Sequence, residues 1–229
     1  MKTLCIIPAR SGSKAIKNKN IQVLGGEKLF IHSLKFAKKL KFVNQIVFSS
    51  DSQKYIKIAS KLKKIFLSKR PRKLSTDRSL MIDVIKYELN KQKQFGNFFD
   101  FILILQPTCP FRKIKDFEKA FRIIRKKKFD TILSISKTRE HPDRLKVFRN
   151  KKLINYNKNL SKENLNPRQN LKPIFIRSGS MYLFDVKLLR KNLIVGKKVY
   201  GILVRGKYSI NIDNKEDLIL AKYYFKKSN

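Results

Sequence analysis

The sequence predicts an α/β protein with three layers, in which a mostly parallel sheet lies between helices. Two observations favour this fold class. Short apolar runs alternate along the chain with segments whose apolar residues recur at helical spacing, as in successive βα units. One run, residues 101–105, is apolar at every position, which is typical of a central parallel strand covered on both faces. The length of 229 residues fits one domain.

The expected strands are short apolar runs that end at polar or turn-forming residues. In chain order they cover residues 4–8, 45–50, 65–67, 101–105, 131–135, 180–184, 199–204 and 209–212. The expected helices carry apolar residues three or four positions apart. They cover residues 30–40, 53–62, 81–89, 114–124 and 218–225. Asp51 and Ser52 are positioned to cap the second of these helices.

The periodic pattern stops between residues 139 and 173. This stretch is polar, rich in Asn and contains three prolines, and it is too long for an ordinary loop. A floppy insertion and a functional arm or dimerisation flap both fit the pattern, and we favour the arm. Because no repeat or linker divides the chain, we predict a single domain over residues 1–229, with 139–173 as its arm.

The charge balance is strongly basic. Lys and Arg number 55 against 16 Asp and Glu, which gives a net charge of +39 and suggests a nucleic-acid partner through counterion release. A different explanation is codon bias, because 41 of these cations are Lys and the chain holds 26 Ile, 16 Asn and only 6 Ala. The lysines are also spread along the chain, and no nucleic-acid-binding motif accompanies them. We therefore expect no nucleic-acid partner.

Other protein classes are excluded by what the sequence lacks. No apolar run approaches the ~20 residues of a membrane span, and the amino terminus is too short for a signal peptide. The two cysteines, Cys5 and Cys109, provide neither a disulfide framework nor a metal-ligand spacing. We expect a cytoplasmic protein without membrane association.

The end of the first predicted strand is a candidate phosphate-binding loop. Small residues let backbone N–H groups approach a phosphate, and nearby cations neutralise its charge. The loop supplies both within eleven residues, through Arg10, Ser11, Gly12, Ser13, Lys14, Lys19 and Asn20. It matches neither the Walker pattern nor the dinucleotide fingerprint, so a basic surface loop is the alternative interpretation.

Six segments together resemble one family. They are residues 6–14 with 19–21; residues 49–51; residues 70–71 with Leu74, Asp77 and Ser79; residues 105–112; residues 166–169 with Gly179 and Tyr182; and residues 212–218. In this order they are similar to motifs of the acylneuraminate cytidylyltransferases, which are the CMP-sialic acid synthetases and their legionaminate and pseudaminate relatives. The similarity extends over nearly the whole chain.

The resemblance implies a Rossmann-like nucleotidyltransferase domain with an inserted dimerisation arm. It also implies a reaction, in which CTP and a nine-carbon keto sugar acid give a CMP-sugar and pyrophosphate. Positioning, cations and Mg²⁺ accelerate such phosphoryl chemistry without covalent catalysis. The implied partners are CTP, the sugar acid and a second copy of the chain in a homodimer.

The resemblance assigns roles to residues that match the family motifs. For nucleotide binding these are Arg10, Ser11, Gly12, Ser13, Lys14, Asn20, Ser50, Arg70, Ser79 and Gln106. For the sugar acid they are Gln106, His141, Gln169 and Ser178, and for catalysis Arg168, Lys19 and Asp213. The implied metal ligands are Asp213 and Asn211, although Asp213 is also positioned to cap the last helix. Arg177 lies beside Ser178 in the region expected to set the choice of sugar.

Departures from the family pattern keep alternatives open. Asn211 stands where many members have a second Asp, so one negative charge is lost at the expected metal site. Ser11, Ser178 and Cys109 replace a Gly, an Asn and a Ser. A synthetase for the eight-carbon acid Kdo is the enzymatic alternative, although its loop usually reads Thr-Arg-Leu-Pro-Gly-Lys after the Ser. A basic nucleic-acid-binding protein is the alternative of another class.

Overall fold

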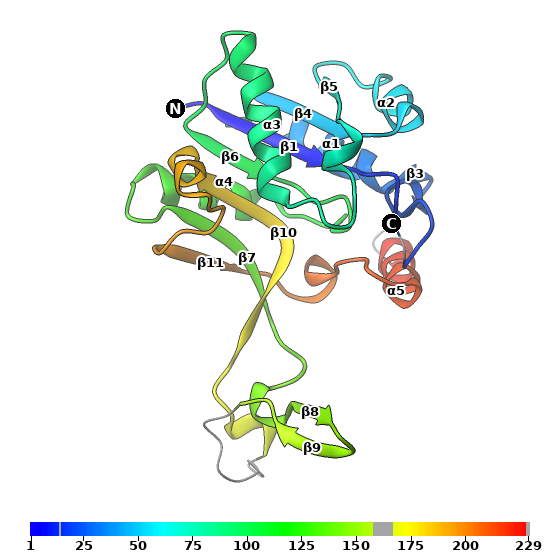
Figure 1. Cartoon of the computed structure of the whole chain (residues 1–229), viewed down its shortest axis with the longest axis vertical. Helices are drawn as coiled ribbons and strands as arrows, with labels where there is room; N and C mark the ends of the chain where they lie inside the picture. Colours follow the sequence, from blue (N-terminus) through cyan, green and yellow to red (C-terminus); the bar gives the residue numbers. More distant parts are fainter. Residues whose placement is uncertain (14, 158–166, 228–229) are drawn as a thin grey trace.

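A computed structural model describes residues 1–13, 15–157 and 167–227, with the backbone alone described for Arg168. Within these residues a seven-stranded sheet has the strand order β11-β7-β10-β6-β1-β4-β5 (Figure 1). Its strands are β1 (Thr3–Pro8), β4 (Gln45–Ser50), β5 (Phe66–Lys69), β6 (Phe101–Ile104), β7 (Thr131–Lys137), β10 (Phe175–Asp185) and β11 (Val199–Leu203). Two small ribbons pair β2 (Val23–Leu24) with β3 (Glu27–Lys28), and β8 (Lys146–Arg149) with β9 (Lys152–Asn155).

The described helices are of two kinds. The α-helices are α1 (Leu29–Lys38), α2 (Gln53–Ala59), α3 (Met81–Gln94), α4 (Ile114–Arg125) and α5 (Lys215–Lys226). The 3-10 helices are η1 (Lys19–Ile21), η2 (Arg72–Leu74), η3 (Pro142–Arg144), η4 (Arg168–Asn170), η5 (Val186–Lys191) and η6 (Gly206–Ser209). None of the described helices has the length and hydropathy needed to cross a bilayer.

The predicted fold class is confirmed, with a mostly parallel sheet between two helical layers. β1 pairs in parallel with β4 and β6, β4 with β5, and β7 with β11, while β10 runs antiparallel to both β6 and β7. Helices α1, α2 and α4 pack on one face of the sheet. Helix α3 and η5 cover the other face. Both faces of the central strands are therefore buried, which explains the fully apolar run at residues 101–105.

A third apolar cluster attaches the last helix to the start of the chain. Helix α5 contributes Leu218 and Ala221, and they pack with Leu24 and Leu29 near the β2–β3 ribbon. The strand predicted at residues 209–212 is wrong, because Ile210 and Ile212 instead enter this cluster from an irregular segment. Their alternation with polar residues reflects burial of one side, without a partner strand.

The stretch at residues 139–173 includes a β-hairpin at the end of the long β7 and β10 strands. In Figure 1 these two strands cross, leave the body and lead to the β8–β9 ribbon. The hairpin turn is made by Asn150 and Lys151, which have φ angles of 50° and 59°. Positive φ at both central residues is typical of a type I′ turn, which usually takes Asn-Gly. The missing Gly explains why the sequence did not indicate this hairpin.

A buried acid beneath the sheet makes stability depend on pH. Glu88 of α3 is fully buried and accepts a 2.6 Å hydrogen bond from Ser49 Oγ. Burial raises the pKa of Glu88, against the hydrogen bonds of Ser49 and Ser68 and the charges of Lys91 and Arg70. A carboxyl whose folded-state pKa is raised stabilises the fold while protonated, and this contribution is lost as pH rises through that pKa.

We therefore expect Glu88→Gln to stabilise the protein at about pH 8 relative to wild type, and to have little effect at about pH 4. The Gln side chain keeps an oxygen that can accept from Ser49 Oγ and removes the buried charge. Thermal unfolding of both proteins at the two pH values measures the difference, with the exposed Glu118→Gln in α4 as control. A variant less stable than wild type at pH 8 would contradict the account.

Candidate functional site

A cavity of about 410 Å³ lies where β1, β5 and β6 end. Segments far apart in the sequence meet there, because the carboxyl ends of parallel strands share one edge of the sheet. Nine residues predicted for the site line this cavity: Arg10, Ser13, Lys19, Asn20, Arg70, Ser79, Gln106, Asn211 and Asp213. The residues that the sequence predicted for the site therefore lie largely together in one cavity.

Two cations in the cavity are held by carboxylates. Arg10 pairs with Asp77 at 2.7 Å, and Lys19 Nζ lies 2.9 Å from Asp213 Oδ1. The Asp213 side chain is 63% exposed, whereas that of Lys19 is only 16% exposed. Because the carboxylate partners Asp77 and Asp213 are exposed, these ion pairs are weak, and an anion with several charges can compete for both cations.

A third cation, Arg70, is built into the cavity wall. Its residue is only 5% exposed, and its Nε donates to Ser75 Oγ at 3.0 Å. Burial lowers the pKa of Arg70. The negative charges of Asp51 and Glu88 act against this shift, and the positive charge of Arg10 adds to it. Because a guanidinium group is not deprotonated in proteins near neutral pH, Arg70 keeps its charge. The cavity therefore presents a fixed positive charge beside two exchangeable ones.

Hydrogen bonds fix the loop after β1. The backbone N–H and the hydroxyl of Ser11 both donate to the Asp51 carboxylate, at 2.8 and 2.6 Å. The Asn20 amide donates to the Arg10 carbonyl at 2.8 Å, and Asn20 is buried. Ser11 is therefore occupied within the protein, and the role of Asn20 in this structure is to hold the backbone of Arg10.

Other residues predicted for nucleotide binding lie close to this loop without lining the cavity. Gly12 is in open space, with no other group within 4 Å of an added Cβ. Ser50 is fully buried at the end of β4, where its Oγ accepts from the Ser52 N–H. The predicted residue Lys14 lies outside the described residues. The nucleotide-binding roles of these three residues stay predictions.

Gln106 follows β6, and two neighbours determine how it lies. Arg112 donates to the Gln106 carbonyl at 2.6 Å, to Ser33 Oγ at 3.1 Å and to the Ser180 carbonyl at 3.1 Å. Burial lowers the pKa of Arg112 to about 10, so it remains charged at neutral pH. Gly179 lies against the Gln106 side chain, and a Cβ at Gly179 would be 2.7 Å from Gln106 Oε1.

A hydrogen-bonded chain leads from a buried thiol to the exposed Asp213. The Cys109 thiol lies 3.4 Å from Asn211 Oδ1, and the Asn211 amide Nδ2 donates to Asp213 Oδ2. Burial raises the pKa of Cys109 to about 11, so the thiol keeps its proton and can donate it. Asn211 thus orients the Asp213 carboxylate.

Asp213 is neither at a strand end nor the cap of the last helix. Asn214 caps α5 in a capping box with Asp217. The Asp217 carboxylate also accepts from the Asp213 N–H at 2.9 Å. The Asp213 side chain therefore remains available to the cavity.

A second cavity of about 890 Å³ lies beside the first and shares Asn211 with it. It is bounded by the end of β7, the start of the arm, the start of β10, η6 and α5. Ser178 is in its wall, and the Ser178 hydroxyl donates to Ser134 Oγ at 2.7 Å. The sugar-binding role of Ser178 stays a prediction.

Two residues predicted for the site, His141 and Gln169, lie on the arm outside both cavities, and the side chain of the third, Arg168, lies outside the described part of the structure. His141 is in contact with the Lys172 carbonyl at 3.2 Å, and its Nδ1 accepts from the Asp143 N–H. Gln169 is exposed in η4, which begins at Arg168. The structure therefore does not bring His141 and Gln169 together with Gln106 and Asp213 within one copy of the chain.

Two residues that organise the site were not predicted as site residues: Arg112, and Asp51, which was predicted only as a candidate helix cap. Both belong to segments that carry the family resemblance, residues 105–112 and 49–51. The available signal for Asp51 was its position directly after β4, whereas Arg112, in the segment between β6 and α4, was marked only by its family motif. Their function in the structure is to hold the backbone at Gln106 and at Ser11.

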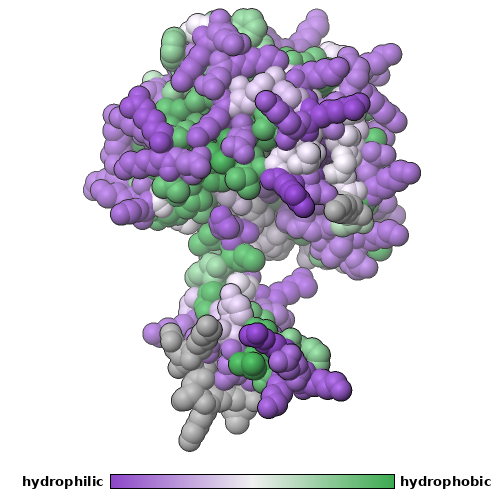
Figure 2. Space-filling view, in the orientation of Figure 1, coloured by the Kyte–Doolittle hydropathy of each residue, from purple (hydrophilic) through white to green (hydrophobic). Residues whose placement is uncertain are grey.

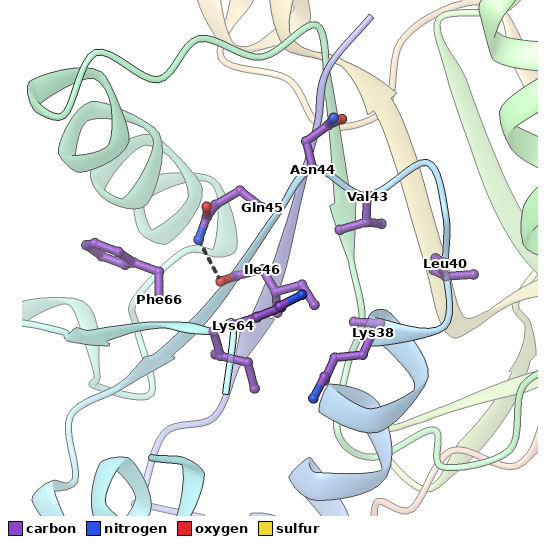
Figure 3. A pocket seen from close by; sticks show the side chains of 10 residues that line it. Lys38, Leu40, Val43, Asn44, Gln45, Ile46, Lys64 and Phe66 are labelled. Atoms are coloured by element: carbon purple, nitrogen blue, oxygen red, sulfur yellow. Dashed lines mark hydrogen bonds between the residues drawn. The ribbon is translucent and has the colours of Figure 1, made fainter. Parts of the chain in front are cut away.

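A different pocket, of about 440 Å³, lies at the opposite edge of the sheet (Figure 3). It is lined by residues near the starts of β4 and β5, among them Gln45, Ile46 and Phe66, and by Lys38 and Lys64. Gln45 donates to the Ile46 carbonyl, so its amide is used locally. Ligands of open α/β sheets bind at the carboxyl ends of the strands, which favours the cavity around Gln106.

The fold and the first cavity define a class of protein. An open, mostly parallel sheet with a cation-lined cavity at its carboxyl edge is the arrangement of α/β proteins that bind nucleotides. Comparison with known proteins gives the particular family. The family model described as "Cytidylyltransferase" matches residues 4–202, and the chain belongs to this cytidylyltransferase family.

Individual relatives agree with this assignment. The chain is 32% identical to a CMP-N,N'-diacetyllegionaminic acid synthase of Legionella pneumophila, over 84% of this chain and 82% of that protein. It is 26% identical to an N-acylneuraminate cytidylyltransferase of Streptococcus agalactiae serotype III, over 96% of this chain. The chain spans about half the length of that relative, at 52%.

A solved structure is similar in fold. The structure of CMP:2-keto-3-deoxy-manno-octonic acid synthetase complexed with CTP matches with a TM-score of 0.71 and 14% sequence identity. The match covers 100% of both chains. At this identity the similarity concerns the fold alone.

Proposed function

We propose that this protein transfers the cytidylyl group of CTP to a nonulosonic acid of the sialic, legionaminic or pseudaminic acid type. The observation that carries the proposal is the convergence of Arg10, Lys19, Arg70, Gln106 and Asp213 on one cavity in a member of the cytidylyltransferase family. The names of the relatives, an N-acylneuraminate cytidylyltransferase and a CMP-N,N'-diacetyllegionaminic acid synthase, support this substrate class.

In the proposed reaction the anomeric hydroxyl of the sugar acid attacks the α-phosphorus of CTP. The sugar O–Pα bond forms, the bond from Pα to the bridging oxygen breaks, and pyrophosphate departs with its electron pair. The hydroxyl proton leaves to solvent or a nearby base. Negative charge grows on the phosphoryl oxygens and on the leaving group, so fixed cations stabilise the transition state.

Each cavity residue has a function in this proposal. Arg10 and Lys19 exchange their present carboxylate partners for triphosphate oxygens, and Arg70 adds a charge that cannot move away. The Gln106 amide can both donate to and accept from a cytosine edge. Because Gly179 has no side chain, the Gln106 amide has room beside it.

The donor set fits Mg²⁺ if most ligands come from the nucleotide. Among the described residues, no group of three or more His, Cys, Asp or Glu side chains could hold a metal ion. Mg²⁺ usually binds through one or two carboxylates together with substrate phosphates and water. The exposed Asp213 carboxylate would hold it, with Asn211 beside it. When bound, Mg²⁺ would neutralise charge on the phosphate oxygens.

The test is an assay of pyrophosphate release with CTP, Mg²⁺ and a panel of acids. The panel contains N-acetylneuraminate, N,N'-diacetyllegionaminate, pseudaminate and Kdo. We expect release with at least one nine-carbon acid, and much less with UTP or ATP in place of CTP. Release with Kdo alone would reassign the enzyme to the eight-carbon acid. Silence with every acid, together with salt-sensitive DNA binding that survives Arg10→Ala, would favour a nucleic-acid-binding protein.

We also propose that the arm pairs with a second copy of the chain. A two-stranded hairpin such as β8–β9 is marginally stable alone in water. Large apolar residues of the arm and of the adjoining start of β10 are nevertheless exposed: Leu145, Val147, Phe148, Leu153, Ile154, Tyr156, Phe175 and Ile176. Hydrophobic residues are visible on the waist and arm in Figure 2. A homodimer would cover them and would bring the arm residues His141, Arg168 and Gln169 to a sugar acid in the other copy.

We expect wild-type protein to sediment as a dimer and Phe148→Glu to sediment as a monomer at the same concentration. Phe148 is 73% exposed on the hairpin, so a charge there should disturb an interface and spare the fold. Tyr223→Glu in α5, which changes an exposed aromatic residue that is not part of the arm, is the control. A monomeric wild-type protein, or a dimer that survives Phe148→Glu, would contradict the proposed arm interface.

A reaction that consumes CTP also fits the expected cytoplasmic location.

A further inference from the structure

A cavity of about 480 Å³ lies between α3, η5 and the loop that leads into β6. It is at the edge of the sheet where β6 begins and β10 ends, and β6 runs parallel to β1. The cavity around Gln106, which is the proposed nucleotide cavity, lies at the opposite edge, where β1 and β6 end. In Figure 1 the arrow of β1 points from the first edge to the second. A partner bound between α3 and η5 would therefore leave the nucleotide cavity open.

The floor of this cavity is apolar and belongs to a packed cluster. Leu89 of α3 and Leu189 of η5 are buried there, and Phe99 and Val186 pack against the same cluster. Because α3 and η5 are both held on the sheet by these contacts, the floor is formed before any partner binds. Its volume lies in the range of about 300–1,000 Å³ that is typical of preformed binding pockets, so it can take an apolar side chain.

The rim of this cavity is cationic. It consists of Lys86, Lys93, Lys187 and Arg190, and no Asp or Glu is among the described residues that line the cavity. Lys86 donates to Asn192 Oδ1 at 2.8 Å. The other three side chains are exposed and form no hydrogen bond or ion pair within the described part of the chain. Three charges of the cationic rim are therefore available to carboxylates of a partner.

An exposed aromatic ring lies beside the cationic rim. Phe98 lines the cavity and is 65% exposed. Outside the arm and the adjoining start of β10, the only other exposed phenylalanine among the described residues is Phe95 in the same loop, whose ring packs against Phe66. Exposed apolar groups beside a pocket mark interaction sites, and aromatic residues are enriched in protein–protein interfaces.

We propose that this cavity is a docking site for an acidic segment of a partner protein. A large apolar side chain of the segment would enter between Leu89, Leu189 and Phe98. Asp or Glu side chains on either side of it would bind the cationic rim. Burial of the apolar side chain would provide most of the affinity, and the complementary charges would accelerate association and select acidic partners.

The chemistry of the cavity favours a protein segment over other anionic partners. A nucleic-acid backbone could neutralise the cationic rim, but it would leave the apolar floor uncovered. The surface of an anionic bilayer is flat, whereas this floor is concave and fits a single side chain. A second copy of the chain is a poor occupant, because each copy carries 55 Lys and Arg against 16 Asp and Glu.

The test uses a fluorescein-labelled peptide in which Asp and Glu residues flank one Phe and one Leu. Fluorescence anisotropy is measured at about 150 mM salt, where long-range attraction to the basic chain is largely screened. We expect saturable binding to wild-type protein and binding about 10-fold weaker or less to Lys93→Glu/Arg190→Glu, because like charges then face the peptide. Lys126→Glu/Lys128→Glu, which reverses two exposed charges after α4, is the matched control and should bind as wild type does.

A second peptide with Ser in place of Phe and Leu has the same charge and should bind wild-type protein about 10-fold more weakly, because it has no apolar group to bury. Equal affinity for the two peptides, equal loss in the two double variants, or absence of binding would overturn the inference. Both double variants should keep the wild-type kcat and KM for CTP, so this outcome is independent of the proposed function.

The other occupants are tested with the same pair of double variants. Vesicles of phosphatidylcholine and phosphatidylglycerol in equal parts and a single-stranded RNA replace the peptide. Binding of either probe that is tighter than that of the peptide and is lost only in Lys93→Glu/Arg190→Glu would overturn the assignment to a protein segment. A change in the sedimentation of Lys93→Glu/Arg190→Glu without any probe would instead assign the surface to a second copy of the chain.

Discussion

Asp213→Asn is expected to lower kcat about 100-fold or more while the Kd for CTP without Mg²⁺ changes little. Asp213 is the exposed carboxylate that Lys19 and Asn211 hold in the nucleotide cavity, and it is the proposed metal ligand. An amide removes its charge but keeps its size. The loss is of the order found when one group that stabilises developing charge is removed from an active site.

The measurement is a Mg²⁺ titration of the initial rate at saturating CTP and sugar acid. The variant should need more Mg²⁺ and should stay slow at saturation. Asp83→Asn, which removes an exposed carboxylate from the first turn of α3, is the control for lost charge. A variant with the wild-type rate and the wild-type Mg²⁺ dependence would exclude Asp213 from the reaction.

Gly179→Ala is expected to lower kcat/KM for CTP about 10-fold to 100-fold, as when one or two hydrogen bonds to the base are lost. Gly179 has a φ of 80°, and its added Cβ would lie 2.7 Å from Gln106 Oε1 and 3.3 Å from Cys109 Sγ. The Gln106 amide must then move. The preference for CTP over UTP should fall with it, because this amide is proposed to bind the cytosine edge.

Gly26→Ala provides the control that separates contact from backbone strain. Gly26 has a φ of 79°, almost the same as that of Gly179, but no other group lies within 4 Å of its added Cβ. Both variants should lose a similar amount of stability, about 1–2 kcal/mol, from the left-handed backbone. Only Gly179→Ala should lose nucleotide selectivity. Equal kinetics in the two variants would contradict the contact with Gln106.

The sequence predicted element boundaries correctly where the apolar pattern and the capping hydrogen bonds indicate the same boundary. The strand at residues 45–50 has the predicted bounds, and Ser52, two residues later, caps α2 as predicted by accepting from the Tyr55 N–H. Helix α3 extends five residues beyond its prediction, since Glu88 and Gln92 are buried polar residues that obscure the apolar period. The antiparallel direction of β10 has no local signal, because it depends on pairing with β6 and β7.

The sequence was sufficient to predict which residues form the candidate site. It was not sufficient to predict the contacts between them. The cavity lining includes Arg10, Lys19 and Gln106 because strand ends meet at one edge. That Ser11 is bound to Asp51 could not be inferred, because the two residues lie 40 positions apart. The +39 charge was the least informative feature, since Lys19 and Arg70 owe their importance to position.

The most direct test of the central claim is a ³¹P nuclear magnetic resonance spectrum of the reaction with CTP, Mg²⁺ and the preferred nonulosonic acid. The account predicts that the three CTP signals are replaced by one signal of a CMP-sugar and one of pyrophosphate, formed in equal molar amounts. Attack of the anomeric hydroxyl on the α-phosphorus requires this pair of products. Formation of CDP with orthophosphate, or an unchanged CTP spectrum with every acid of the panel, would contradict it.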